Sequence, residues 1–187
     1  MGILNITPNS FSDGGLYFNK EAAIARAHEM VSMGADVIDV GGESSRPGSS
    51  PVSTEEELDR VLPVISEITR SLDVPVSIDT FKPEVAEAAA EAGAHILNDI
   101  SGLQFDAGLA DVAAKWGMGL ILMHMRGVPR TMQNNPHYDD LLEEISGFLQ
   151  QAARKALDAG VERSAIALDP GIGFGKTFEH NWEILSN

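Results

Sequence analysis

The sequence predicts an α/β fold built on a parallel sheet, and two features of its 187 residues support this prediction. Short apolar runs alternate with longer stretches of helical periodicity, which is the pattern of repeated βα units. The short runs are apolar along their whole length, as expected for strands that are covered on both faces of the sheet. The alternation shows no linker or low-complexity segment. We therefore expect a single domain over residues 1–187.

Six short runs are predicted to be strands. They are residues 2–6, 36–40, 74–79, 95–98, 119–123 and 165–169. A polar side chain stands at or just past the C-terminal end of each: Asn5, Asp39, Asp79, Asn98, His124 and Asp169. Barrels and open α/β sheets place active sites at this edge of the strands. For any one of these residues, a role in capping the following loop is as good an explanation as a role in a site. For six residues at equivalent positions, a shared site is favoured.

The longer stretches are predicted to be helices, and several carry start or stop signals. They are residues 20–33, 54–72, 83–92, 108–116, 138–159 and 177–186. Ser53 precedes an acidic run that suits a first turn, and Pro83 suits a first helical position. Gly34, Gly93 and Gly160 follow last turns. Each predicted helix therefore follows a predicted strand.

Six βα units fall short of the eight that close a barrel of roughly 250 residues. Two architectures fit this count: an open doubly wound sheet, or a TIM-type (β/α)8 barrel that lacks its C-terminal part. The sequence ends in the first turns of a helix without a stop signal. We therefore expect an incomplete TIM-type barrel of about six βα units.

Composition excludes several classes of function. The net charge of −15 disfavours binding to nucleic acid, which relies on Lys and Arg. No apolar run is long enough to span a bilayer and the first residues do not form a signal peptide, so a cytoplasmic location is expected. The absence of cysteine excludes disulfides and thiolate metal sites. A phosphorylated substrate would need a metal or local cations, and five basic residues lie in loops: Arg46, Lys82, Arg126, Arg130 and Lys176.

The first two loops carry groups suited to a cation and an anion. In NITPNSFSDGG, the amide oxygen of Asn5 can coordinate a hard cation, and Phe11 and Asp13 can close over a ligand. In GGESSRPGSS, Arg46 precedes the stiff residue Pro47, which presents the guanidinium to a phosphate or carboxylate. The alternatives are a solvated turn for the first loop and an ordinary ion pair for Arg46.

Later strand ends carry groups that would bind a flat nitrogen heterocycle. Paired donors on such a ring require carboxylates and amides held by strands, and Asp79, Asn98 and Asp169 meet this requirement. Apolar side chains that could lie beside the ring are Ile100, Met123 and Phe174. The alternative for Asp169, which precedes Pro170, is a simple turn former.

Two familiar site classes do not fit. DPGIGFGKT lacks the first glycine of a P-loop, because that position is Pro170, and Lys176 stands where a dinucleotide fingerprint needs glycine. No HxH or HExxH spacing exists, so any metal should be Mg²⁺ held by oxygen atoms. What remains is a glycine-dense turn able to lie close to a flat ligand.

The chain resembles the dihydropteroate synthases, a family of pterin-binding enzymes, in five segments: MGILNITPNSFSDGG, IDVGGESSRPG, SIDTFKPEVAEAAAEAGAHILNDISG, LMHMRG and LDPGIGFGKT. The resemblance runs from the first segment to the last, in the same order and spacing. It implies an enzyme of folate biosynthesis, a transferase that condenses 6-hydroxymethyl-7,8-dihydropterin diphosphate with p-aminobenzoate in the presence of Mg²⁺. Sulfonamides would compete with p-aminobenzoate. Small molecules are thus the expected partners. The oligomeric state is left open, with a homodimer of the full-length protein as one alternative.

The resemblance also assigns roles by matching positions. It implies pterin binding by Asp79, Asn98, Ile100, Met123 and Asp169; a p-aminobenzoate pocket of Phe11, Pro47 and Phe174; catalytic roles in the loops for Asp13, Ser45 and Arg46; and a metal contact for Asn5. Asn9 and Ser45 depart from the usual aspartate and threonine of the family.

Family members also extend beyond both ends of this sequence and carry two further βα units. These units hold a lysine that contacts the pterin and an arginine–histidine pair that binds the diphosphate. A fragment with the present bounds is therefore expected to have little synthase activity. Two alternatives of other classes are a pterin-binding methyltransferase of the methyltetrahydrofolate type and a non-catalytic pterin-binding module.

Overall fold

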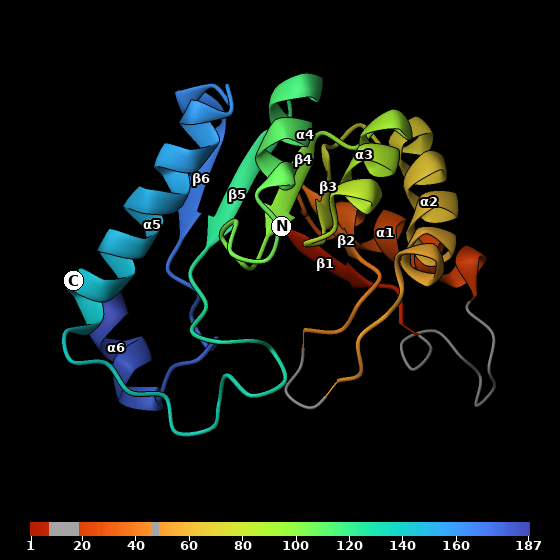
Figure 1. Cartoon of the computed structure of the whole chain (residues 1–187). Coiled ribbons are helices and arrows are strands. Elements are labelled where there is room, and N and C mark those ends of the chain that lie inside the picture. Colours follow the sequence, from red (N-terminus) through yellow and green to blue (C-terminus); the bar gives the residue numbers. More distant parts are fainter. Residues whose placement is uncertain (8–18, 46–48) are drawn as a thin grey trace. The chain divides into compact units, whose positions relative to one another are not determined.

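The structure is a computed structural model that describes residues 1–7, 19–45 and 49–187, and Figure 1 shows its elements in chain order. The predicted site residues Phe11, Asp13, Arg46 and Pro47 lie outside the described residues. The chain forms two compact units. The first comprises Met1–Ser44 and Pro51–Asn98, and the second comprises Ser45–Ser50 and Asp99–Asn187.

All six predicted strands are present, with bounds that differ from the prediction by at most two residues. They are β1 (Gly2–Asn5), β2 (Ile38–Gly41), β3 (Val76–Asp79), β4 (Ile96–Asp99), β5 (Gly119–Met123) and β6 (Ile166–Asp169). In the first unit β1 pairs with β2, β2 with β3 and β3 with β4, always in parallel. In the second unit β5 pairs in parallel with β6. Parallel strands alternating with helices confirm the predicted α/β class.

The six predicted helices are also present, together with a short 3-10 helix before β6. They are α1 (Lys20–Ser32), α2 (Thr54–Ser71), α3 (Pro83–Glu91), α4 (Gly108–Trp116), α5 (Leu141–Asp158), the 3-10 helix η1 (Arg163–Ala165) and α6 (Phe178–Ser186). Helix α5 begins three residues later than predicted, because Asp140 caps it by accepting the N–H of Glu143 at 3.1 Å. Tyr138 lies outside the helix, and its hydroxyl instead donates to the Gly175 carbonyl at 2.8 Å.

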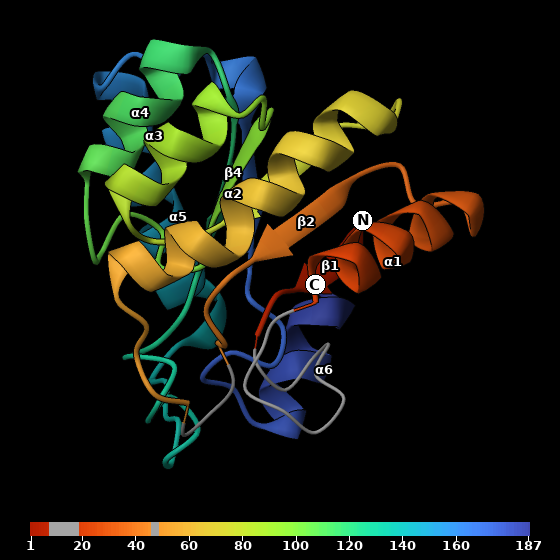
Figure 2. The ribbon, with the colours of Figure 1, turned by 90° about the vertical axis from the view of Figure 1, so that its right-hand side faces the viewer.

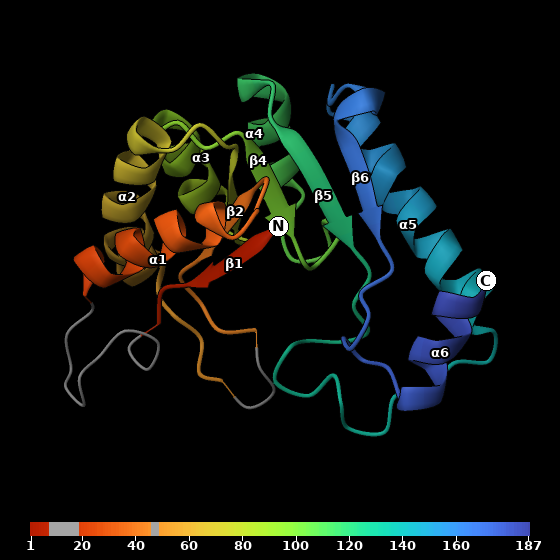
Figure 3. The same cartoon turned by 180° about the vertical axis from the view of Figure 1, so that it is seen from behind.

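Each unit buries its own apolar core between helices and strands. In the first unit, α1, α2 and α3 lie side by side along the strands (Figure 2), and α2 contributes the fully buried Val61, Val64, Ile65 and Ile68. In the second unit, α5 packs along β5 and β6 (Figure 3). None of the described helices is long and apolar enough to cross a membrane.

Two strands differ from the expectation that both faces of every strand are covered. Ile3 on β1 is 51% exposed and Leu168 on β6 is 48% exposed. Strands β2 and β3, which have neighbours on both sides, bury Ile38, Val76 and Ile78 completely. The described residues thus leave about half of Ile3 and of Leu168 exposed, so the apolar pattern of these two strands predicts more cover than the described residues provide.

Candidate functional site

A row of polar side chains crosses the C-terminal ends of the first four strands. Asn5, Gly41, Asp79 and Asn98 are successive register partners on β1, β2, β3 and β4. Partners in a parallel register point to the same face of the sheet. A Cβ atom placed on Gly41 would lie 3.4 Å from both Asn5 Oδ1 and Asp79 Oδ2. The side chains of Asn5 and Asp79 therefore converge on a gap that the absent side chain of position 41 leaves open.

Asp39 lies two residues before Gly41 and orients one member of this row. Its Oδ2 accepts a hydrogen bond from Nδ2 of Asn98 at 3.1 Å, which turns the amide oxygen of Asn98 away from Asp39. Burial raises the pKa of Asp39, and the nearby side chains of Ser77 and Asn98 offset this only in part. Among the described residues its Oδ1 has no hydrogen-bond partner of ordinary geometry. We did not predict this positioning role; the available signal was a carboxylate inside an otherwise apolar strand.

Lys82 forms an ion cluster with two glutamates, of which Glu57 is fully buried and Glu43 is partly buried. Its Nζ donates to Glu43 Oε2 at 2.6 Å, to Glu57 Oε2 at 2.5 Å and to the Val52 carbonyl at 2.8 Å. Burial alone would lower the pKa of Lys82, but the hydrogen bonds to Glu43 and Glu57 outweigh it and raise that pKa. Lys82 thereby joins Glu43, at the start of the loop after β2, to Val52 at its end. Glu43 is thus paired with Lys82.

In the second unit, three predicted site residues lie in one apolar cluster. Ile100 and Met123 are buried with Met125 and Met132, and Phe174 packs against them while remaining partly exposed. Ile100 follows Asp99, whose buried carboxylate accepts the N–H groups of Ser101 at 2.8 Å and Leu103 at 2.6 Å. The turn after β4 is thus fixed by its own aspartate, and the cluster gives an apolar surface suited to one face of a ring.

Asp169 is the register partner of Met123 and stands at the end of β6. Its Oδ1 accepts the N–H of Gly171 at 2.7 Å, so the carboxylate does form the turn considered as the alternative. Its backbone carbonyl accepts the His124 N–H at 2.9 Å, which extends the pairing of β5 and β6 by one step. This hydrogen bond engages Oδ1, so the second carboxylate oxygen, Oδ2, is the candidate acceptor for a ligand.

The glycine-dense turn after β6 lies against protein backbone. A Cβ on Gly171, whose φ is +71°, would stand 2.0 Å from the His124 carbonyl oxygen. A Cβ on Gly175 would stand 3.1 Å from the Arg126 carbonyl oxygen. Gly171 and Gly175 thus allow a close approach to residues 124–126, and the approach of this turn to a flat ligand stays a prediction.

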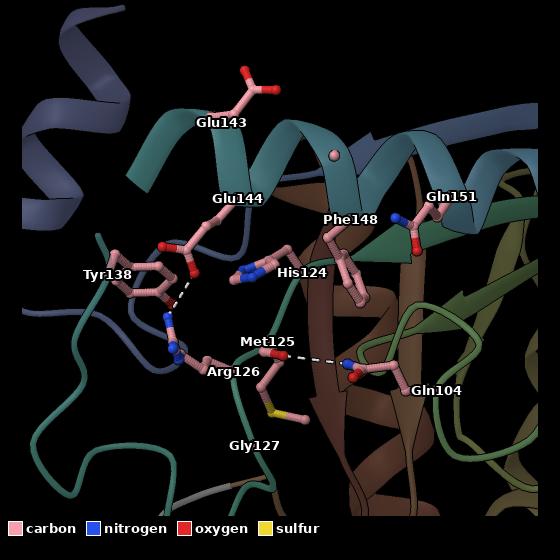
Figure 4. A pocket seen from close by; sticks show the side chains of 11 residues that line it. Gln104, His124, Met125, Arg126, Gly127, Tyr138, Glu143, Glu144, Phe148 and Gln151 are labelled. Carbon is pink, nitrogen blue, oxygen red and sulfur yellow. Dashed lines mark hydrogen bonds and ion pairs between the residues drawn. The ribbon is translucent and has the colours of Figure 1, made fainter. Parts of the chain in front are cut away.

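A cavity of about 440 Å³ lies beside the first turns of α5 (Figure 4). Its polar lining includes Arg126 and Glu144, which form an ion pair at 2.8 Å, and the Arg126 guanidinium also lies 4.7 Å from the centre of the Tyr138 ring. Among the predicted pterin and p-aminobenzoate residues that the structure describes, none lines this cavity. We therefore do not place the predicted site in it.

Three of the loop cations considered for phosphate binding already have protein partners. Lys82 pairs with Glu43 and Glu57, and Arg126 pairs with Glu144. Lys176 is buried and contacts His124 and the Phe174 carbonyl. Arg46 lies outside the described residues, and Arg130 is exposed. Lys82, Arg126 and Lys176 are thus engaged by protein groups in the structure, and whether any of the five loop cations contacts a phosphate stays a prediction.

His124 should make stability depend on pH. Burial, followed by the charge of Lys176, lowers its pKa from 6.5 to about 4. The unfolded chain therefore binds a proton between pH 6.5 and 4 that the folded chain excludes, so stability is complete above pH 6.5 and falls toward pH 4. The full shift corresponds to roughly 3 kcal/mol, and the open cavity beside the ring reduces this to about 1–2 kcal/mol. Urea unfolding at pH 7 and pH 4.5 should show this loss in the native protein and a smaller loss in His124→Gln; equal losses would exclude His124 as the cause.

The oxygen atoms of the row suit a hard divalent cation. In the described part of the chain no three His, Cys, Asp or Glu side chains gather as metal ligands. Mg²⁺, however, is usually held by one or two protein oxygens together with water and substrate phosphates. The converging oxygens of Asn5 and Asp79 fit that kind of site.

The whole chain, residues 1–187, matches the family model described as pterin binding enzyme. A curated dihydropteroate synthase from Clostridium beijerinckii is 51% identical over 187 residues, which are all of this chain and 67% of that protein. The crystal structure of Yersinia pestis dihydropteroate synthase with a sulfonamide drug complex matches with a TM-score of 0.91 and 48% identity, over 99% of this chain and 67% of that one.

A second solved structure, Xanthomonas albilineans dihydropteroate synthase with 4-aminobenzoic acid, matches with a TM-score of 0.91 and 44% identity. The match covers all of this chain and 66% of the other. The chain thus spans about two thirds of the length of these proteins. Their similarity over the whole chain confirms the predicted fold class, an incomplete TIM-type barrel.

Proposed function

Because the chain belongs to the pterin-binding enzyme family, we propose that the protein carrying it is a dihydropteroate synthase. It would condense 6-hydroxymethyl-7,8-dihydropterin diphosphate with p-aminobenzoate and release pyrophosphate. The support is the row of Asn5, Asp79 and Asn98 at one edge of the strands, together with the similarity to synthases at 51% identity. A homodimer of the full-length protein and a cytoplasmic location remain predictions.

The pterin would be bound through hydrogen bonds to its ring edges and apolar contacts with its faces. Carboxylates of Asp79 and Asp169 would accept from ring N–H and amino groups, and Asn98, oriented by Asp39, would present its amide oxygen. Ile100 and Met123, which share one apolar cluster, would lie along the ring. We propose these five residues as the pterin site.

The diphosphate would be bound beside Asn5. The amide oxygen of Asn5 would coordinate Mg²⁺; this oxygen and Asp79 Oδ2 each lie 3.4 Å from a Cβ placed on Gly41. When bound, Mg²⁺ supplies positive charge for the leaving diphosphate. The predicted roles of Asp13, Arg46 and Ser45 concern the two loops that would cover this group. Ser45 is described as partly buried, next to residues 46–48.

The proposed reaction requires stabilisation of a positive charge on the pterin and needs no nucleophilic side chain of the protein. Departure of the diphosphate leaves a cationic pterin, which the amine of p-aminobenzoate attacks. Carboxylates near the ring stabilise that positive charge, and the apolar cluster of Met123 and Phe174 excludes water from it. Phe174, with Phe11 and Pro47, would form the p-aminobenzoate pocket.

Formation of dihydropteroate with release of pyrophosphate on mixing the two substrates tests this proposal. A methyltransferase would instead consume methyltetrahydrofolate and release no pyrophosphate, and a binding module would bind pterin without turnover. The assay uses the natural protein that carries this sequence. Absence of pyrophosphate release with retained pterin binding would remove the synthase assignment.

Asp79→Asn and Asp169→Asn should each weaken pterin binding. Each change removes a charged acceptor and should cost about 1.5–3 kcal/mol, or roughly tenfold to a hundredfold in the dissociation constant. Isothermal titration calorimetry with the pterin substrate measures this. Asp73→Asn, at an exposed residue, is the matched control and should bind as the native protein does. Unchanged affinity in both site variants would show that the pterin binds elsewhere.

A further inference from the structure

Lys176 is a buried cation to which the proposed reaction assigns no role. Only 3% of the residue is exposed. Its Nζ lies 3.0 Å from His124 Nδ1, 3.0 Å from the Phe174 carbonyl oxygen and 3.4 Å from the His124 carbonyl oxygen. These three acceptors match the three N–H groups of an ammonium, so Lys176 has no donor left for a substrate phosphate.

Burial of this ammonium among neutral acceptors is costly. Burial lowers the pKa of Lys176 to about 8, and the Asp169 carboxylate counteracts this effect only in part. Methionine would fill the same space without the cost of burying a charge. The unfavourable burial of the charge indicates that the hydrogen bonds of the ammonium to His124 and Phe174 have a role of their own.

The contacts of Lys176 join the two strand ends that carry the apolar cluster. His124 follows β5 directly after Met123, and Phe174 belongs to the turn after β6. The His124 N–H donates to the Asp169 carbonyl at 2.9 Å, and the Phe174 N–H donates to the Gly171 carbonyl at 3.0 Å. The ammonium thus fixes the backbone of Phe174 against the end of β5, where the Phe174 ring packs on the cluster with Met123.

The tautomer of His124 follows from the same contact. Nδ1 must be the acceptor when it faces an ammonium, so Nε2 carries the ring proton. His124 packs edge-on against Phe148 with ring centres 5.0 Å apart, which holds the imidazole in place. The hydrogen bond from Lys176 Nζ therefore goes to an imidazole whose position is fixed by packing.

We propose that Lys176 is a positioning residue that holds Phe174 as a wall of the p-aminobenzoate pocket, without touching either substrate. The proposal rests on the proposed function, because it assigns Phe174 to that pocket. The proposal predicts different effects on the two substrates. A displaced Phe174 should impair the use of p-aminobenzoate. The Lys176 hydrogen bonds go to His124 and Phe174, so the polar pterin-binding groups of Asp79, Asn98 and Asp169 should still bind the pterin.

Lys176→Met in the natural protein tests the proposal. The KM for p-aminobenzoate should rise roughly tenfold or more, because displacement of a substrate wall by about 1 Å has effects of that size. The dissociation constant of the pterin should change less than about threefold. Lys155→Met, at an exposed residue of α5, is the matched control and should leave both values unchanged. An unchanged KM for p-aminobenzoate, or an equal loss for both substrates, would overturn the proposal.

Two further measurements separate this proposal from the proposed function. Amide hydrogen exchange in residues 171–175 should become faster in Lys176→Met than in Lys155→Met, whatever reaction the protein catalyses. Lys176→Cys, alkylated in urea with 2-bromoethylamine and refolded, restores an ammonium at nearly the original length and should recover the native KM and exchange rates. Failure of synthesis in the native protein would reject the function alone; slow exchange in residues 171–175 of Lys176→Met would reject the positioning role alone.

Discussion

Gly171→Ala should lower the free energy of unfolding by about 2–4 kcal/mol, because a new methyl group meets the backbone where β5 and β6 end. The added Cβ would lie 2.0 Å from the His124 carbonyl oxygen, and no side chain can move to relieve this contact. The φ of +71° adds a cost of about 1–2 kcal/mol for any residue with a Cβ. Urea unfolding of the variant and the native protein measures the loss.

Gly173→Ala is the matched control for this change. Gly173 lies in the same turn with a φ of +84°, but a Cβ there would meet no atom within 4 Å. It should therefore cost only about 1 kcal/mol of backbone strain. The difference between the variants isolates the clash with His124. Equal losses would contradict the close packing of the turn against residues 124–126.

Lys82→Met should lower the free energy of unfolding by about 3–5 kcal/mol, which is as much as or more than Gly171→Ala. Glu57 is only 1% exposed, and Lys82 is the cation that neutralises it, so the variant leaves a buried carboxylate without its partner. The two ends of the loop after β2 also lose their connection through Glu43 and Val52. Thermal or urea unfolding gives the loss, and Lys115→Met, at an exposed residue, should have little effect.

A double variant distinguishes lost charge pairing from lost packing. Adding Glu57→Gln to Lys82→Met removes the unpaired carboxylate and should recover a large part of the stability, because a neutral amide is cheaper to bury than a charge. A double variant that is as unstable as the single one would show that the side chain of Lys82 acts through its volume.

The sequence alone predicted the order and type of the elements because both signals are local. Strands β1 to β6 were found from apolar runs, and the polar row of Asn5, Asp79 and Asn98 followed from the rule that parallel strands end at one edge. The start of α5 was placed too early because Tyr138 fits the helical pattern. Its hydrogen bond to Gly175, 37 residues away, is a tertiary contact that periodicity does not encode.

The partners of charged side chains could not be predicted in the same way. The sequence identifies three basic residues only as loop cations: Lys82, Arg126 and Lys176. The three-dimensional structure shows their partners, which are Glu57 for Lys82, Glu144 for Arg126 and His124 for Lys176. The hydrogen bond between Asp39 and Asn98 could not be predicted for a different reason. Asp39 was counted among the polar strand ends, but its link to Asn98 depends on which residues of β2 and β4 share a face, and this follows from the register.

Glycine at position 41 is a residue to look for in other sequences with this strand pattern, because its lack of a side chain leaves a gap between Asn5 and Asp79. An alanine there would place a methyl group 3.4 Å from the oxygens of both Asn5 and Asp79, in the space that a hydrated ion would occupy. Since no unusual backbone angle requires glycine at this position and the contacts of the added methyl group are of ordinary length, an alanine would be compatible with the fold and would fill the gap between these two side chains.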